Sequence, residues 1–206
     1  FEIKKFVLAS TSSLYGSSDV LPFREDDNTR KPLSPYAASK KAAEALCYTY
    51  HYLYGIDITV LRYFTVYGPA GRPEMSLFRF VQWICEGRKV IVFGDGNQSR
   101  DFTYIDDIAD GTIKALKPVG YEIINLGSDQ PIVLLDAIRL IEKMAGCRAD
   151  LLMRPRHPAD VTATRADITK AEKILGWRPV HDFEQGVNSL LSWYQANRGW
   201  AKDIAT

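Results

Sequence analysis

A tyrosine and a lysine four residues apart open an alanine-rich segment, "SPYAASKKAAEA". Ser34 is suited to cap a helix and Pro35 to occupy its first position. In that helix Tyr36 and Lys40 lie on one face. An ammonium group beside a phenol favours the phenolate, which can take a proton from a sugar hydroxyl near neutral pH. The alternative is an ordinary amphipathic helix in which Lys40 pairs with Glu44.

A second group of reactive side chains follows an apolar segment at 6–10. It consists of four consecutive hydroxyl residues, Ser10, Thr11, Ser12 and Ser13. In an open parallel sheet, ligands bind beyond the carboxyl ends of the strands, so a hydroxyl there can hydrogen-bond a substrate oxygen. Turn formation is the alternative, since Ser and Thr also satisfy nearby backbone groups.

The elements that must position these residues alternate between strands and helices. Apolar strands at 6–10 and 57–64 flank the alanine-rich helix, which predicts a right-handed βαβ crossover with parallel strands. We interpret the Asp106–Asp107 pair as helix capping by Asp106 in preference to a catalytic carboxylate dyad. Further strands are predicted at 90–94, 101–105, 121–127 and 149–155, and further helices at 76–87, 106–116, 134–146, 168–176 and 182–197. The pattern indicates a mixed α/β fold, with a parallel part first and a smaller irregular part afterwards.

Composition limits the classes of function. The chain has 206 residues, 46% of them hydrophobic and 25% charged, enough for one large domain or a domain with a small lobe. A net charge of +1 gives no reason to expect nucleic acid or a membrane as partner. The cysteines form no CxxC pair and the histidines no metal-ligand spacing, which predicts reduced thiols in the cytoplasm and no metal site. No apolar run or charged leader suggests a membrane span or signal peptide.

The beginning of the chain carries an expectation of its own. The strand at 6–10 has no element before it, whereas a buried parallel strand needs a neighbour on each side. We therefore expect residue 1 to be a cut inside a domain. The strand would then present an open apolar edge that invites pairing or aggregation.

Several motifs in one order carry a family resemblance. A strand-end hydroxyl lies about two dozen residues before YxxxK, and "LRYFTVYGP" and "RDFTYIDD" follow. This order, over residues 4–195, resembles the extended short-chain dehydrogenase/reductase family of NAD-dependent nucleotide-sugar epimerases and dehydratases. The resemblance implies the C-terminal part of a Rossmann-like parallel sheet plus a smaller mixed α/β substrate-binding lobe. Residues 1–70 would be a partial NAD-binding domain without its G-x-x-G-x-x-G half. Residues 71–206 would mainly bind the nucleotide sugar, with 101–127 returning to the Rossmann part.

The resemblance also implies roles for the reactive residues. In that family NAD takes a hydride from C4 of the sugar and leaves a 4-keto intermediate. Tyr36 would take the hydroxyl proton, and Lys40 would assist it and hold the nicotinamide ribose. Thr11 would bridge to the sugar hydroxyl, with Ser13 completing the catalytic hydroxyl network. Tyr63 would lie by the nicotinamide.

The substrate follows from two further segments. "TSSLYG" offers Ser12 to the substrate but lacks the acid that dehydratases carry after the threonine, which favours epimerisation. "TVYGPAGRPEM" resembles the UDP-glucuronate 4-epimerase subgroup. Thr65 stands where galactose-type epimerases have asparagine. Arg72 would bind the sugar carboxylate with two hydrogen bonds, the alternative being a surface arginine.

The resemblance places nucleotide recognition in the later half. Arg100 would meet the diphosphate, Phe93 the uracil ring and Asp160 the ribose. In that last loop the chain departs from the family pattern, because Ala159 replaces a glycine and His157 an arginine.

The function predicted from the sequence is C4 epimerisation of UDP-glucuronate to UDP-galacturonate. Without the phosphate-binding glycine loop, we expect the isolated chain to show little or no turnover. One alternative is an epimerase or dehydratase for another UDP- or dTDP-sugar, and another is a non-catalytic nucleotide-sugar-binding or interaction module. The resemblance also raises a homodimer through the YxxxK helix.

Overall fold

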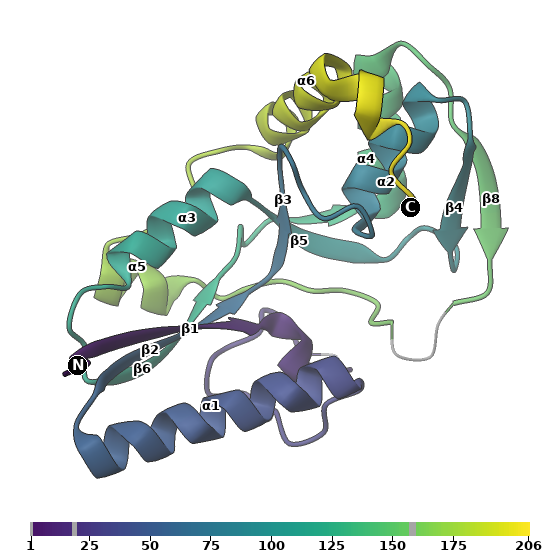
Figure 1. Ribbon diagram of the computed structural model, residues 1–206. Helices are drawn as coiled ribbons and strands as arrows, with labels where there is room; N and C mark the ends of the chain where they lie inside the picture. The colour runs from purple at the N-terminus through teal and green to yellow at the C-terminus, as the bar shows by residue number, and fades with distance from the viewer. Residues whose placement is uncertain (1, 18–19, 157–159) are drawn as a thin grey trace.

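The computed structural model describes residues 2–17, 20–156 and 160–206 (Figure 1). The elements run in the order β1 (Lys5–Thr11), a 3₁₀ turn (Ser12–Tyr15), α1 (Pro35–Tyr54), β2 (Asp57–Tyr63), β3 (Thr65–Tyr67), α2 (Ser76–Cys85), β4 (Lys89–Phe93), β5 (Ser99–Tyr104), α3 (Ile105–Lys114), β6 (Tyr121–Leu126), β7 (Pro131–Val133), α4 (Leu134–Ala145), β8 (Asp150–Arg154), α5 (Thr169–Leu175) and α6 (Phe183–Ala201).

A three-stranded parallel sheet, in the order β1-β2-β6, carries the N-terminal part. The α1 helix covers one face of this sheet, and α3 and α5 lie on the other side (Figure 1). Its central strand β2 is apolar and buried because it is covered on both faces. The carboxyl ends align, with Thr11 beside Tyr63 and Tyr63 beside Leu126. The predicted βαβ unit is confirmed.

The first strand is less buried than its apolar sequence predicted. Only Ser10 and Thr11 of β1 are buried, and Phe6 is 44% exposed. The reason is that β1 pairs with β2 alone among the described residues, so its outer edge is open. Apolar side chains from β1 and α1 line a groove there, including Phe6 and Leu46.

The second part combines short sheets with three helices. Strands β3, β5 and β7 form one mixed sheet, and β4 pairs in parallel with β8. Helices α2, α4 and α6 pack together at one end of the molecule (Figure 1). Their shared core includes Val81, Ile138 and Leu190. Strands β3 and β7 were not predicted from the sequence, because each has only three residues.

Helix starts follow the capping prediction in one case and depart from it in another. Ser34 Oγ accepts the Ala37 N–H at 3.1 Å, as predicted for α1. The prediction for Asp106 was wrong, because α3 begins at Ile105 and Tyr104 precedes it without a side-chain cap. The neighbouring Asp107 instead accepts the backbone N–H groups of residues 180 and 181 at 3.1 and 3.2 Å. That carboxylate therefore anchors the chain that leads into α6.

Three findings concern membranes, metals and thiols. Within the described ranges, no helix combines the length and apolarity needed to cross a membrane. The same residues contain no group of three or more His, Cys, Asp or Glu that could hold a metal ion. Cys47, Cys85 and Cys147 are free thiols.

Candidate active site

The tyrosine and lysine of α1 lie at the carboxyl end of β1. Tyr36 is 50% exposed and lines a cavity of about 580 Å³. Lys40 Nζ donates to the carbonyl oxygen of Ala9 in β1 at 2.9 Å. Glu44 bonds elsewhere, to Arg62 and Ser10, so the alternative in which Lys40 pairs with Glu44 is wrong. The ammonium group is therefore anchored to the strand that carries the hydroxyl residues.

Those hydroxyl residues form another wall of this cavity, which we call the sugar cavity. Thr11 ends β1, is buried, and lines the cavity together with Ser12 and Ser13. Thr11 Oγ1 donates to Ser13 Oγ and accepts the Ser13 N–H, both at 3.1 Å. The cluster thus caps the 3₁₀ turn and also faces the cavity, so turn formation and ligand contact are compatible here.

The remaining wall comes from the end of β2 and the loop after β3. Tyr63 lines the cavity, and its hydroxyl lies 2.8 Å from the Thr112 hydroxyl of α3. Thr65, at the start of β3, and Arg72 also line it. The Arg72 side chain is 70% exposed and pairs with Glu74. Hydrogen bonds from its own backbone N–H and from Arg72 lower the pKa of Glu74.

A second cavity, of about 510 Å³, holds the three residues predicted to bind the nucleotide. We call it the nucleotide cavity. Phe93 ends β4, whereas Arg100 and Asp160 form an ion pair across 60 residues of sequence. Burial lowers the pKa of Arg100 and the charge of Asp160 opposes this, so the group stays cationic at neutral pH. The departures at His157 and Ala159 lie outside the described residues.

A smaller cavity of about 200 Å³ joins the two. It shares Ser12 and Thr65 with the sugar cavity and Arg100 and Asp160 with the nucleotide cavity. The structure therefore brings the predicted ligand contacts, except Lys40, which lines none of these cavities, around one depression formed by the three. A ligand in it would pass from hydroxyl groups and a phenol at one end to a guanidinium and an aromatic ring at the other.

This arrangement agrees with a match to a family model. Residues 1–127 match the model described as the NAD dependent epimerase/dehydratase family. The chain belongs to this family. The match covers more than half of the chain, including the YxxxK helix and "RDFTYIDD". The family resemblance seen in the sequence is confirmed.

Similar sequences are named as uronate epimerases. The chain is 55% identical over 205 residues to a UDP-glucuronate 4-epimerase of Thermodesulfobacterium geofontis (strain OPF15), covering 99% of this chain and 63% of that protein. It is 39% identical over 207 residues to UDP-glucuronate 4-epimerase 4 of Arabidopsis thaliana, covering 91% of this chain and 47% of that protein. The chain thus spans about half to two thirds of the length of these relatives.

Solved structures of similar proteins share the fold. A UDP-glucuronic acid 4-epimerase from Bacillus cereus, in complex with UDP-glucuronic acid and NAD, superimposes with a TM-score of 0.90 at 37% identity, over 96% of this chain and 63% of that one. A UDP-glucose 4-epimerase from Thermotoga maritima, with UDP-glucose, gives a TM-score of 0.90 at 29% identity, over 95% and 64%. The predicted α/β fold with a parallel sheet is confirmed.

In this epimerase/dehydratase family member, a buried polar network that was not predicted from the sequence holds α1 against the sheet. Arg62 of β2 donates to both carboxylate oxygens of Glu44 in α1, at 3.0 and 2.9 Å. Ser10 donates to Glu44 at 2.6 Å, and Arg62 donates to the Tyr15 hydroxyl at 3.0 Å. Burial raises the pKa of Tyr15 to about 12. The available sequence signal was an arginine inside an otherwise apolar strand.

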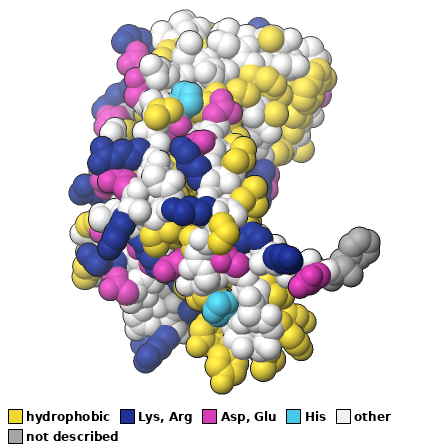
Figure 2. All heavy atoms as spheres, turned by 90° about the vertical axis from the view of Figure 1, so that its left-hand side faces the viewer, with side chains coloured by type: hydrophobic (Ala, Val, Ile, Leu, Met, Phe, Trp, Pro, Cys, Tyr) yellow, Lys and Arg dark blue, Asp and Glu magenta, His cyan; other side chains and the backbone are white. Residues whose placement is uncertain are grey.

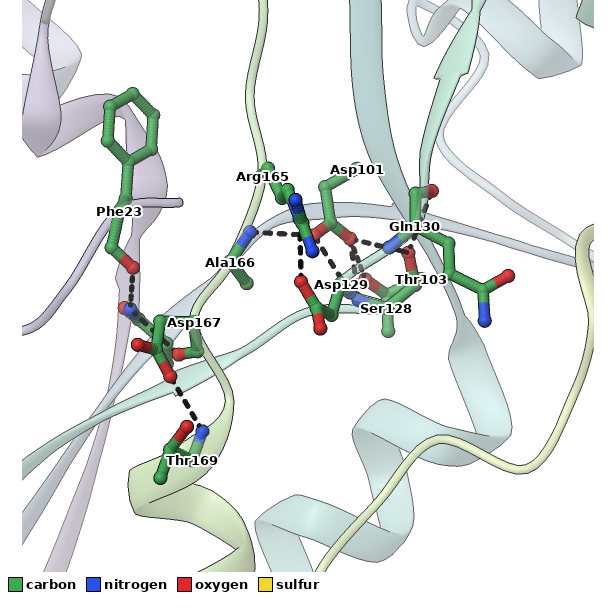
Figure 3. A network of polar contacts seen from close by, with 11 residues as sticks. Phe23, Asp101, Thr103, Ser128, Asp129, Gln130, Arg165, Ala166, Asp167 and Thr169 are labelled. Carbon is green, nitrogen blue, oxygen red and sulfur yellow. Dashed lines mark hydrogen bonds and ion pairs between the residues drawn. The ribbon is translucent and has the colours of Figure 1, made fainter. Parts of the chain in front are cut away.

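A second network, around the fully buried Asp101, supports the nucleotide cavity (Figure 3). The carboxylate accepts five hydrogen bonds of 2.6 to 3.2 Å, from the Thr103 hydroxyl, the Ser128 N–H and hydroxyl, and the N–H groups of Asp129 and Ala166. It therefore ties residues 128–129 and 166 to β5. Because Arg100 precedes Asp101 and Asp160 lies six residues before Ala166, the network fixes the backbone on both sides of that ion pair.

Proposed function

We propose that the chain forms the substrate-binding side of an NAD-dependent UDP-glucuronate 4-epimerase. The observation that carries this proposal is the position of Arg72, a cation on the wall of the cavity that also holds Tyr36 and the strand-end hydroxyl groups. In the proposed division, residues 1–70 serve the cofactor side and 71–206 mainly the nucleotide sugar.

The residues present fit the nicotinamide end of NAD. Tyr36 lines the sugar cavity, and no residue in the described part of the chain hydrogen-bonds its hydroxyl. Lys40 has two further N–H donors beyond its bond to Ala9. Lys40 and Tyr63 would hold the nicotinamide ribose side. NAD supplies the exchange of hydride with C4 when it is bound.

The chain's own residues would perform the proton transfer. The Tyr36 phenolate oxygen takes the proton of the C4 hydroxyl and later returns it. The sugar undergoes no net oxidation because the hydride removed from C4 also returns to it. The Thr11 and Ser13 hydroxyls hold the C4 oxygen in line with that phenol. Because the keto sugar has to present its other face before the hydride returns to C4, its binding site must allow rotation about the diphosphate.

The remaining residues would fix the ligand along the depression. Ser12 and Thr65 hydrogen-bond the sugar ring, and Arg72 binds the uronate carboxylate with two parallel N–H···O bonds. Arg100 meets the diphosphate, which would compete with Asp160 for its guanidinium. Asp160 is then available to the ribose hydroxyls, and Phe93 packs on the uracil ring.

Calorimetric titration of the chain with UDP-glucuronate and with UDP-glucose tests this proposal. We expect tighter binding of the uronate, and Arg72→Ala should weaken the uronate on the order of 10-fold while leaving UDP-glucose within about twofold, since a hydrogen bond to a charged group contributes about 1.5–3 kcal/mol. Arg139→Ala is the matched control, because Arg139 is 69% exposed and also pairs with a nearby carboxylate.

The same titration tests a neutral-sugar epimerase as the second candidate. This alternative is favoured by the exposure of Arg72, whose charge is already matched by Glu74. Equal binding of both sugars by the unmodified chain, with no selective effect of Arg72→Ala, would replace the uronate with a neutral substrate. Absence of binding by a folded chain would contradict both candidates.

A further inference from the structure

Arg79 on α2 has an unusual environment. The Arg79 Nε atom is buried and has no hydrogen-bond partner. Among the side chains of the described residues that are at least partly buried, no other buried nitrogen or oxygen lacks one. A buried N–H that has lost water and found no acceptor is unfavourable, so such an atom calls for an explanation. Binding sites are one place where an unmatched donor is retained, because the ligand supplies the acceptor.

The surroundings hold this guanidinium at the nucleotide cavity. Its central carbon lies 5.6 Å from the centroid of the Trp83 ring, one turn further along the same helix. A cation over an aromatic face is attracted by the ring and restricted in its motion. Arg79 and Trp83 both line the nucleotide cavity, together with Phe93 and Arg100.

The charges around this cavity leave Arg79 without a hydrogen-bonded counter-ion. Two carboxylates line the cavity, Glu74 and Asp160. The charge of Arg79 helps to lower the pKa of Glu74, but the hydrogen bond to Glu74 comes from Arg72. Asp160 accepts its hydrogen bond from Arg100. The cavity can therefore accept an anion at Arg79 without breaking an existing ion pair.

The start of α2 adds a second donor group at the same place. Ser76, the first residue of the helix, also lines the nucleotide cavity. The residue before it, Met75, makes no side-chain cap, and the first turn contains no acidic residue. Free backbone N–H groups at a helix start favour negative charge, and phosphate oxygens suit both these groups and a planar guanidinium.

We propose that Arg79 binds a phosphoryl group of the UDP-sugar, as a second cation beside Arg100. The inference rests on the proposed function and deepens it. Arg100 must leave Asp160 to bind phosphate, whereas the Arg79 guanidinium has no hydrogen-bonded carboxylate to release. Loss of Arg79 should therefore affect phosphorylated ligands selectively.

Calorimetry with UDP and with uridine, on the chain and on Arg79→Met, tests the inference. Methionine keeps an apolar stem over Trp83 and removes the charge and the N–H donors. We expect UDP affinity to fall at least about 10-fold in Arg79→Met while uridine affinity stays within about twofold. Arg79→Lys should fall between the two for UDP, because it keeps the charge without the planar fork. Arg139→Met, an exposed arginine in α4, should leave both affinities unchanged.

Three outcomes would overturn the inference. Equal losses for UDP and uridine would make Arg79 a support for the nucleoside. Unchanged UDP affinity in Arg79→Met, with an unchanged melting temperature, would remove it from the site while leaving the proposed function standing. Failure of the folded, unmodified chain to bind UDP would overturn both proposals together.

Discussion

The two ends of the depression differ in whether their polar side chains already bond to other residues of the chain. In the sugar cavity, the Tyr36 hydroxyl has no hydrogen bond to any described residue. In the nucleotide cavity, Arg100 and Asp160 already hold each other. A group that exchanges a proton with a substrate must be accessible, whereas a cation that binds phosphate can be paired with a carboxylate until the ligand arrives, as Arg100 is. The difference separates an end suited to chemistry from an end suited to affinity.

The supports of the two ends differ as well. A buried ion pair, Glu44 with Arg62, holds α1, the helix of Tyr36 and Lys40, against the parallel sheet. A single buried carboxylate, Asp101, holds the nucleotide end through neutral N–H and O–H donors (Figure 3). Asn125 accepts a hydrogen bond from the Tyr15 hydroxyl at 2.6 Å and donates one to the Phe23 carbonyl oxygen at 3.0 Å. Substitutions at each end should therefore separate chemistry from binding.

The largest expected effect is on chemistry alone. Tyr36→Phe removes the proton acceptor, so epimerisation should fall on the order of 10³-fold. UDP-glucuronate affinity should change less than about threefold, because the hydroxyl contributes one neutral hydrogen bond to binding. The measurement is turnover with NAD, on the chain completed with the part of its relatives' length that it does not span. Turnover within tenfold of the unmodified protein would show that another group takes the proton.

The second largest expected effect is a loss of stability where α1 packs on the parallel sheet. Glu44→Ala leaves Arg62 buried without its counter-ion and should cost about 3–5 kcal/mol in the free energy of unfolding. Urea unfolding measures this loss. Replacing both residues with methionine should recover most of it, since an apolar pair of similar volume needs no partner. Glu172→Ala, which breaks the exposed pair with Arg178, should cost less than about 1 kcal/mol.

The third expected effect is a loss of both stability and UDP affinity at the nucleotide cavity. Asp101→Ala removes the acceptor of five hydrogen bonds and should cost about 3 kcal/mol of stability. Unlike Tyr36→Phe, it should also weaken UDP, because the backbone beside Arg100 and Asp160 loses its anchor. Calorimetry on the folded variant measures this, with the exposed Asp136→Ala as control. Unchanged UDP affinity would show that the network stabilises the fold without positioning the site.

The smallest expected effect is on the pH dependence of stability, at Asp57, which lines neither cavity. Burial opposes ionisation of Asp57, but bonds from Lys5 and from the N–H groups of Gly120 and Val119 outweigh it and lower its pKa. Its contribution to stability should be complete above the unfolded-state pKa, near 3.9, and be lost as pH falls through the lower folded-state value.

Asp57→Asn should therefore lower stability at pH 7 by about 1 kcal/mol or less, and the difference should shrink below about pH 4. Urea unfolding at several pH values measures it, with the exposed Asp26→Asn as control. A difference that grows as the pH falls would contradict the sign of the pKa shift. UDP affinity should not change.

A patch outside the depression bears on the predicted homodimer. Large apolar side chains gather at the lower end of the molecule, over α1 (Figure 2). They belong to the second half of that helix and are 53 to 76% exposed: Tyr48, Tyr50, Tyr52, Leu53 and Tyr54. Such a patch is large for a free surface, so association through α1 stays a prediction that the concentration dependence of the sedimentation coefficient can test.

The sequence by itself determined the elements with strong local signals and the residues that carry motifs. The cap at Ser34, the helix after it and the apolar strand β2 follow from propensity and periodicity, which act over a few residues. The family motifs identified Tyr36 and Lys40 in the same local way. The βαβ pattern predicted the parallel strands on either side of this helix, but not the hydrogen bond from Lys40 to Ala9 of β1.

Only the tertiary structure decided which distant side chains meet. The partner of Glu44 is Arg62, 18 residues away, and that of Arg100 is Asp160, 60 residues away. The unmatched Nε–H of Arg79 likewise depends on burial, which packing from several elements creates. Such pairings are set by the free energy of burying a charge. This free energy depends on which residues surround the charge in the folded chain, and the sequence alone does not show them.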